Sequence, residues 1–366
     1  MKQLLLLLVL TASLHAESKY PVDVSYMVAD IKYSKELGVK ICEVQHGIMS
    51  TFYGDVHLNP ERGLICPKIA SVFAELSPKR WMCGSNVAFA TLRASLERQP
   101  GWTNRVTLSS ILNDPAFIAA AAKAPEDPYD ISSYSGMLFM NPTTQYDPAN
   151  YPGIILMDAP THPYWADKYK MSLLFRRSEA LSSIKPEWQI YKKEYSPELA
   201  ENIAQDLGGT CFVIKPRGGF LGNGVIIVSL DDLDKTLSTI LGDPEPLKAS
   251  KDKSYNHWAR DPFNSFIVER YYPSDLITHE GKLYEPSMRV AFICSYNKQQ
   301  IDFRFLGGYW MLPTKSIDEE GSLNERKKAY CKPPYFTNAS QEDLQEIERE
   351  LSATIPLLYQ EMLEGP

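Results

Sequence analysis

The sequence lacks the motifs that most directly assign a catalytic function. Its 366 residues contain no Gly-Lys-Ser/Thr loop, no Gly-x-Ser-x-Gly nucleophile elbow and no Cys-x-x-Cys pair. The first absence excludes a P-loop nucleotide site. A hydrolase stays open from the residue inventory alone, although no elbow marks one. The sequence also has no internal repeat and no low-complexity tract.

Cysteine is sparse and carries no zinc signature. The six cysteines are at positions 42, 66, 83, 211, 294 and 331. His46 and His57 lie near Cys42 and Glu43, but this spacing fits no common zinc motif. Three of the cysteines sit in apolar, strand-like runs, where a free thiol behaves as a small hydrophobic group. The cysteines therefore decide neither a disulfide framework nor a compartment.

Positive charge and long apolar runs are also scarce. The formal net charge is −7, and no run of lysines and arginines is longer than a few residues. This balance argues against nucleic acid or an anionic membrane surface as a partner. The apolar run at residues 4–10 is far shorter than the ~20 residues that a membrane helix needs. We therefore expect no stable membrane span.

Residues 1–16 have the layout of a short export signal. Lys2 precedes the apolar run, and Ala16 ends the segment. This arrangement predicts cleavage after Ala16 and an exported or secreted protein. Leu14 occupies a position where such cleavage sites usually have a small residue. An uncleaved first strand in a cytoplasmic protein is therefore the alternative.

The composition is that of a catalytic globular protein. A chain of 366 residues can bury a sizeable core and predicts two or three subdomains. Residues 115–165 are rich in Pro, Asp, Asn, Tyr and Ser and end in an apolar, strand-like run. This pattern predicts long loops joined to part of a βαβ subdomain.

The most informative stretch is residues 211–228. A β-branched run ends in Lys215-Pro216, glycines follow at 218, 219, 222 and 224, and a second β-branched run returns. This pattern predicts a glycine-rich hairpin. Glycine lets backbone N–H groups approach an anion, and the lysine adds a positive charge, so the hairpin indicates nucleotide-phosphate binding. The candidate residues are Lys215, Gly218, Gly219, Gly222 and Gly224. An ordinary glycine-rich turn is the alternative.

A second hairpin is predicted near the N-terminus. A turn at residues 34–38 places Asp30 opposite Glu43, and strand alternation puts Gln45 on the same face. Two carboxylates and an amide oxygen suit Mg²⁺ or Mn²⁺ shared with substrate phosphates. Because like charges repel across a strand pair, we expect a repulsion in the metal-free hairpin that a cation relieves. A solvent-facing edge hairpin with incidental acids is the alternative.

From residue 167 to about 325 the chain resembles the ATP-grasp superfamily, in which two α+β lobes hold ATP under a flexible hairpin. The resemblance follows several segments in order. They are Asp167-Lys168 before a helix-compatible stretch, the glycine-rich hairpin, a helix-like stretch from Ser229, a strand and hinge at 266–275, a strand containing Arg289, and a strand-like segment at 301–306 containing Arg304.

The order of the elements resembles that of a circularly permuted ATP-grasp domain. From Ser340 a capping-box-like start and apolar residues at helical spacing predict the family's next helix, which ends the chain. The strand pair that carries the family's magnesium site comes instead at residues 24–45. The family usually has Asn where this chain has Gln45, so the metal geometry differs at that position.

The resemblance implies a mixed fold class, α+β or α/β, with two lobes and an additional βαβ-type subdomain. It also implies a division into five segments. These are a signal peptide at 1–16, a metal-binding hairpin of the large lobe at 17–60, a subdomain preceding the lobes at 61–165, a small lobe with the glycine-rich loop at 166–262, and a large lobe at 263–366.

The activity that the resemblance implies is an ATP-dependent, ADP-forming ligase that uses Mg²⁺ or Mn²⁺. A small-molecule or peptide carboxylate attacks the γ-phosphate, and an amine or thiol captures the acylphosphate. The implied roles are phosphate contact for Lys168 and Lys215, metal binding for Asp30, Glu43 and Gln45, contact with the transferred phosphoryl group for Arg289 and Arg304, ribose contact for Glu269 or Asp275, and adenine packing for Tyr271 and Tyr272.

Two other functions stay open at this stage. One is an ATP-grasp phosphotransferase that stops at a phosphorylated product, and the other is an exported small-molecule-binding protein without catalysis. ATP is scarce outside cells, so an export signal conflicts with ATP use. Delivery into a host or an organelle lumen that contains ATP would remove the conflict.

Overall fold

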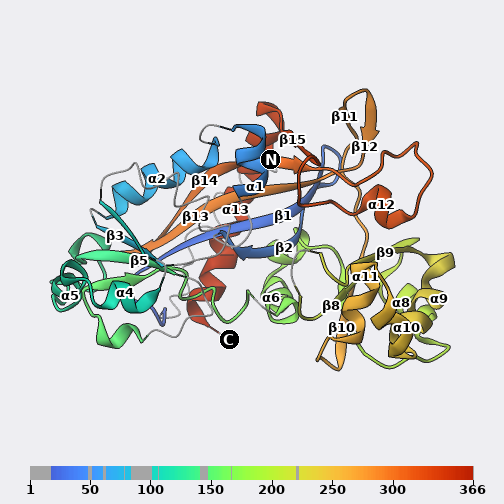
Figure 1. Cartoon of the computed structure of the whole chain (residues 1–366), viewed down its shortest axis with the longest axis horizontal. Coiled ribbons are helices and arrows are strands. Elements are labelled where there is room, and N and C mark those ends of the chain that lie inside the picture. The colour runs from blue at the N-terminus through green and yellow to red at the C-terminus, as the bar shows by residue number, and fades with distance from the viewer. Residues whose placement is uncertain are drawn as a thin grey trace, which may run out of the picture.

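Figure 1 shows the computed structural model of the chain, which has a mixed α/β fold. The structure describes residues 18–47, 52–60, 63–77, 79–83, 101–105, 107–140, 147–165, 167–219 and 222–365. The export signal predicted at residues 1–16 lies outside these ranges. No helix in the described ranges is both long and apolar enough to cross a bilayer.

The central sheet has five antiparallel strands in the order β15-β14-β13-β1-β2. Its strands are β1 (Asp23–Ser34), β2 (Gly38–His46), β13 (Ser287–Asn297), β14 (Gln300–Met311) and β15 (Phe336–Asn338). Strands β1 and β13 are buried along almost their whole length because both faces of the sheet are covered. The N-terminal hairpin and the C-terminal strands therefore share one sheet.

Helix α13 (Gln341–Glu364) covers one face of the central sheet. Ser340 caps its start by accepting a hydrogen bond from the backbone N–H of Asp343. The apolar positions of the helical repeat pack against β1, β2 and β13, and the C-terminal helix predicted from the sequence is confirmed. Two shorter helices, α6 (Lys168–Phe175) and α7 (Glu179–Ser183), complete this layer.

The opposite face of the central sheet packs against helix α2 and a second, parallel sheet of order β4-β3-β5-β6. Tyr26 of β1 meets Phe139 of this sheet with ring centroids 6.2 Å apart. Parallel strands need crossover connections, which is the arrangement expected of a βαβ-type unit. The elements of this region are α1 (Phe52–Leu58), α2 (Ile65–Leu76), β3 (Arg80–Cys83), β4 (Trp102–Arg105), α4 (Leu108–Leu112), α5 (Pro115–Ala121), β5 (Gly136–Met140) and β6 (Ile154–Leu156).

A third sheet, antiparallel and of order β7-β10-β8-β9, lies at the other end of the molecule from the parallel sheet (Figure 1). Amphipathic helices cover it and form a separate hydrophobic core. We call this sheet with its helices the small unit. Its elements are β7 (Trp188–Lys192), α8 (Leu199–Leu207), β8 (Cys211–Pro216), β9 (Ile226–Ser229), α9 (Leu230–Leu241), α10 (Pro244–Ala249), α11 (Lys253–Asn256) and β10 (Ser265–Arg270).

Strand β10 corrects the division drawn from the sequence. That division ended the small lobe at residue 262, but β10 pairs with both β7 and β8 and is an inner strand of the small sheet. Its apolar side chains Phe266 and Val268 belong to the core of the small unit. The chain therefore leaves the small unit after β10. A two-stranded ribbon, β11 (Ile277–His279) and β12 (Lys282–Tyr284), follows. Along the chain, helix α12 (Leu323–Lys327) comes after β14 and before β15.

Candidate functional site

A cavity of about 400 Å³ lies between the central sheet and the small unit. Its apolar lining includes Val213 and Ile227 from the small sheet and Met311 from β14. Six lysine and arginine side chains line it against three carboxylates. The charged residues are Lys32, Lys215, Arg270, Arg289, Lys327 and Lys328, with Asp30, Glu43 and Glu269. An excess of positive charge beside apolar walls suits a ligand with a flat apolar part and several negative charges.

The N-terminal hairpin has the predicted pairing at the predicted place. Asp30 of β1 lies directly opposite Glu43 of β2. The register then shifts between Asp30 and Ile31, because Ile31 pairs with Ile41 and leaves Cys42 as a bulged extra residue. Because of this bulge, Cys42 and Glu43 both line the cavity, while Ile41 and Val44 both pack on the side of α13.

The expected repulsion between the two opposed carboxylates is absent, because each has its own cation. Arg289 lies opposite Asp30 on the other neighbouring strand and donates two hydrogen bonds to it, both 2.7 Å long. Arg289 is only 6% exposed. Burial opposes its charge, but Asp30 more than compensates and raises the pKa of Arg289 above its usual value. The sequence-based prediction placed Arg289 and the two acids in one nucleotide site but did not include an ion pair between Arg289 and Asp30.

Glu43 is paired with Lys168, the first residue of α6. The Lys168 ammonium lies 2.9 Å from the Glu43 carboxylate and donates to the carbonyl of Gly219 at 2.6 Å. Burial alone would raise the pKa of Glu43, but Lys168 holds it below its usual value. Asp167, the N-cap of α6, pairs with Arg217 at 2.6 Å. The start of α6 thus connects the hairpin to the glycine-rich loop.

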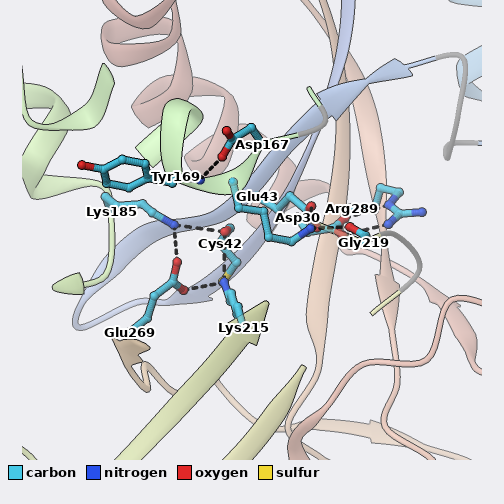
Figure 2. A network of polar contacts seen from close by, with 11 residues as sticks. Asp30, Cys42, Glu43, Asp167, Tyr169, Lys185, Lys215, Gly219, Glu269 and Arg289 are labelled. Atoms are coloured by element: carbon cyan, nitrogen blue, oxygen red, sulfur yellow. Dashed lines mark hydrogen bonds and ion pairs between the residues drawn. The ribbon is translucent and has the colours of Figure 1, made fainter. Parts of the chain in front are cut away.

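Lys215 shares one buried carboxylate with a second lysine that the sequence did not single out (Figure 2). Glu269 accepts from Lys185 at 2.6 Å and from Lys215 at 2.5 Å. Both lysines also donate to the carbonyl of Cys42, at 3.0 and 3.2 Å. Burial opposes the charge of Glu269, but the two ammonium groups hold its pKa below its usual value. Both Glu269 oxygens are therefore engaged by lysines, which differs from the ribose contact expected of this residue.

The glycine-rich hairpin is confirmed as a strand pair. Strands β8 and β9 are antiparallel, with Cys211 opposite Ser229. Three of its glycines have positive φ values, 101° at Gly219, 69° at Gly222 and 75° at Gly224. Of the predicted glycines, Gly222 lines the cavity, while a Cβ at Gly218 would come within 2.8 Å of Phe263. Residues 220 and 221 lie outside the described part of the chain.

The remaining predicted residues divide between the cavity and the surface. Gln45, Tyr271 and Tyr272 line the cavity. Asp275 instead lies at the β1–β2 turn, where its carboxylate accepts from the backbone N–H of Lys35 at 2.9 Å. The Arg304 side chain is 52% exposed and pairs with Asp302 at 2.6 Å. Neither Asp275 nor Arg304 is among the residues that line the cavity.

The sequence analysis also did not predict a second cluster of charged residues at the cavity. Lys32 donates to the carbonyl of Pro286 at 2.9 Å and to the Tyr271 hydroxyl at 3.2 Å. Burial lowers the pKa of Lys32 to about 8. The Glu285 carboxylate accepts from Tyr271 and from Lys327. Strand alternation from Asp30 could have found Lys32, which follows it by two residues, whereas no sequence pattern marks Lys327 or Glu285.

The donor chemistry of the hairpin suits a hard cation, although both carboxylates have other partners here. Asp30, Glu43 and Gln45 offer carboxylate and amide oxygens at one cavity. Among the described residues, no three histidine, cysteine, aspartate or glutamate side chains are close enough together to hold a metal ion. A metal at this place would therefore depend on the amide, on ligand phosphates and on water for its remaining ligands.

The sequence matches no model of a protein family and no curated protein sequence. Solved structures do match. A crystal structure of a protein assigned as a gamma-glutamylcysteine synthetase from Methylobacillus flagellatus is 13% identical, with a TM-score of 0.48, and the match covers 92% of this chain and 88% of that chain. D-alanyl-alanine synthetase A from Vibrio cholerae is 11% identical, with a TM-score of 0.34, and the match covers 78% of this chain and 80% of that chain.

Proposed function

We propose that the chain is an ATP-dependent ligase, which joins a carboxylate to an amine or thiol through an acylphosphate and releases ADP. One observation carries the proposal. Three cations gather around the Asp30–Glu43 strand pair, where the central sheet faces the small unit. They are Lys168, Lys215 and Arg289, and together with the strand pair they come from four separate segments of the chain. Such a set of cations and acids is what phosphoryl transfer requires, because positioning and charge neutralisation dominate its catalysis.

The walls of the cavity divide the ligand between two environments. The side chains of Val213, Ile227 and Met311 offer apolar contact for a base. Lys215 offers positive charge to the phosphates, and Tyr271 and Tyr272 line the cavity where β10 ends. Lys168 lies at the small adjoining cavity and meets the large one through its pair with Glu43. The bidentate pair with Asp30 fixes the orientation of the Arg289 guanidinium, so it can meet the transferred phosphoryl group without reorganisation.

The chemistry then needs no nucleophilic side chain. A carboxylate oxygen of the substrate bonds to the γ-phosphorus while the bond from that phosphorus to ADP breaks. The amine or thiol of the second substrate attacks the acyl carbon, phosphate leaves, and the proton of the attacking group passes to solvent. The lysines and Arg289 hold the negative charge that moves between these groups.

Asp30, Glu43 and Gln45 would hold a Mg²⁺ or Mn²⁺ ion, which neutralises phosphate charge when bound. Lys168 would then exchange its carboxylate partner for a phosphate, while Arg289 would keep its pair with Asp30. A hairpin that joins the large sheet from the N-terminal end of the chain also supports the proposed circular permutation of an ATP-grasp domain.

An ADP-release assay with pooled carboxylates and amines tests the proposal. We expect metal-dependent ADP formation that requires both a carboxylate and an amine or thiol. Arg289→Ala should lower the rate at least a hundredfold, at a cost of ~3 kcal/mol in transition-state stabilisation. Arg304→Ala is the matched control, since Arg304 also lies on a central-sheet strand but outside the cavity.

Other results would separate the competing functions. A phosphorylated product made without an amine or thiol indicates a phosphotransferase. Nucleotide binding without ADP formation from any pool indicates a binding protein and contradicts the ligase. An Arg304→Ala variant that loses as much activity as Arg289→Ala contradicts the placement of the site.

A further inference from the structure

Two buried lysines at the cavity share a single carboxylate. Lys185 is 5% exposed, Lys215 is 7% exposed and Glu269 is 2% exposed. Lys215 and Glu269 line the large cavity, whereas Lys185 is not among its lining residues and instead lines a small adjoining cavity of about 20 Å³. Lys185 therefore has no direct access to a ligand in the large cavity. Its role must be exerted through its partners.

The charges of this trio do not cancel. Glu269 engages Lys215 through one oxygen and Lys185 through the other. If Glu269 had only Lys215 as a partner, the two would form a neutral pair and the ammonium would attract a phosphate weakly. The second lysine divides the carboxylate between two cations and leaves one net positive charge at the floor of the cavity.

The geometry ties the same trio to the bulge in the hairpin. The carbonyl of Cys42 accepts from Lys185 at 3.0 Å and from Lys215 at 3.2 Å. The two ammonium groups thus have the same two partners, Glu269 and the Cys42 carbonyl (Figure 2). This arrangement holds the Lys215 ammonium in place between the small unit and the central sheet.

We infer that Lys185 is a positioning residue that sustains anion binding at Lys215 by taking a share of the Glu269 charge. The inference rests on the proposed function in one respect, that the large cavity holds a nucleotide polyphosphate. It goes beyond that function because it assigns a role to a residue that does not reach the ligand.

Variants of the full chain that remove, restore or keep the charge of the trio test the inference. Inorganic pyrophosphate and ADP are titrated separately into each variant by calorimetry. Lys185→Met leaves Glu269 and Lys215 as a neutral pair, and we expect pyrophosphate to bind roughly tenfold to a hundredfold more weakly. The double variant Lys185→Met/Glu269→Gln restores one net positive charge and should recover most of the affinity. Lys185→Arg keeps the charge and should stay close to wild type.

The matched control is Lys248→Met, which removes one positive charge from an exposed pair with Glu245 on α10 and should leave the affinity unchanged. A purely structural role of Lys185 predicts a lower melting temperature but no recovery of affinity in the double variant. Wild-type affinity in Lys185→Met, or no recovery in a folded double variant, would overturn the inference while the proposed function stands.

The two probes separate the two claims. If wild type binds pyrophosphate in a Lys185-dependent way but shows no tighter binding of ADP, the nucleotide function fails and the charge-sharing role remains. If wild type binds neither probe, both are overturned.

Discussion

Asp23, the first residue of β1, carries a carboxylate buried between the central sheet and α13, with 1% of its surface exposed. Its oxygen Oδ2 accepts from the Ser25 hydroxyl at 2.7 Å and from the Tyr359 hydroxyl. Burial is the main cause that raises the pKa of Asp23 to about 7, and the charge of Asp158 adds to it. Between about pH 4 and pH 7 the folded protein therefore holds a proton at Asp23 that the unfolded chain has already released.

This raised pKa predicts the direction of a pH effect. The stability from the bound proton is fully present below the unfolded pKa of about 4 and is lost as the pH rises to about 7. Asp23→Asn removes the titration. Urea unfolding should show the stability of wild type relative to Asp23→Asn falling by about 3 kcal/mol between pH 5 and pH 8. An unchanged difference would contradict the raised pKa.

The two acids of the hairpin should differ in what their loss costs. Asp30→Asn leaves the buried Arg289 guanidinium without its bidentate carboxylate and should lower the free energy of unfolding by about 3 kcal/mol. Glu43→Gln breaks a more exposed pair with Lys168 and should cost about 1 kcal/mol. Chemical denaturation without nucleotide or metal measures both. A stabilised Asp30→Asn protein would indicate that repulsion between the acids outweighs the Arg289 pair.

At the scale of elements, local sequence patterns predicted single helices and hairpins, but they did not predict which distant segments pair with one another. Turn residues and periodicity are local properties of the sequence. They predicted the glycine-rich hairpin, the C-terminal helix and the opposition of Asp30 and Glu43. The membership of β10 in the small sheet and the partners of Lys215 depend on residues far along the chain. A single sequence carries no signal for such contacts, so Lys185 was missed.

The bulge at Cys42 is a testable element of the site. Deletion of Cys42 keeps Glu43 opposite Asp30 and keeps Ile41 and Val44 facing α13, because the strand then alternates regularly. It removes the carbonyl that both buried lysines share. We therefore expect a folded protein with at least fivefold weaker ADP binding, an effect of about 1 kcal/mol for one lost acceptor.

Cys42→Ala is the matched control for the deletion, since it keeps the backbone carbonyl and changes only the thiol. Calorimetry of both variants should show normal ADP affinity for Cys42→Ala. Equal weakening in the two variants would attribute the effect to the side chain and contradict the role assigned to the bulge.

At the scale of the whole molecule, the cavity lies between two parts of the protein that each have their own hydrophobic core. The small unit has its own hydrophobic core, and the central sheet supplies the opposite wall of the cavity. The segment that contains α12 bridges the two parts, because Asn324 accepts from the backbone N–H of Ile227 at 2.7 Å and Lys328 donates to the carbonyl of Val225 at 2.8 Å. A ligand in the cavity should therefore stabilise both parts together, by about 2.7 kcal/mol at a hundredfold excess over its dissociation constant.

Calorimetric titration of Mg²⁺–ATP into wild type and Lys215→Ala tests the central claim most directly. Lys215 lies 7% exposed at the floor of the cavity and is the ammonium assigned to the phosphates. We predict that wild type binds Mg²⁺–ATP and that Lys215→Ala, while still folded, binds it at least tenfold more weakly, because a charge-assisted contact is worth about 1.5–3 kcal/mol. Equal affinity in the two proteins, or no binding to wild type, would contradict a nucleotide site in this cavity.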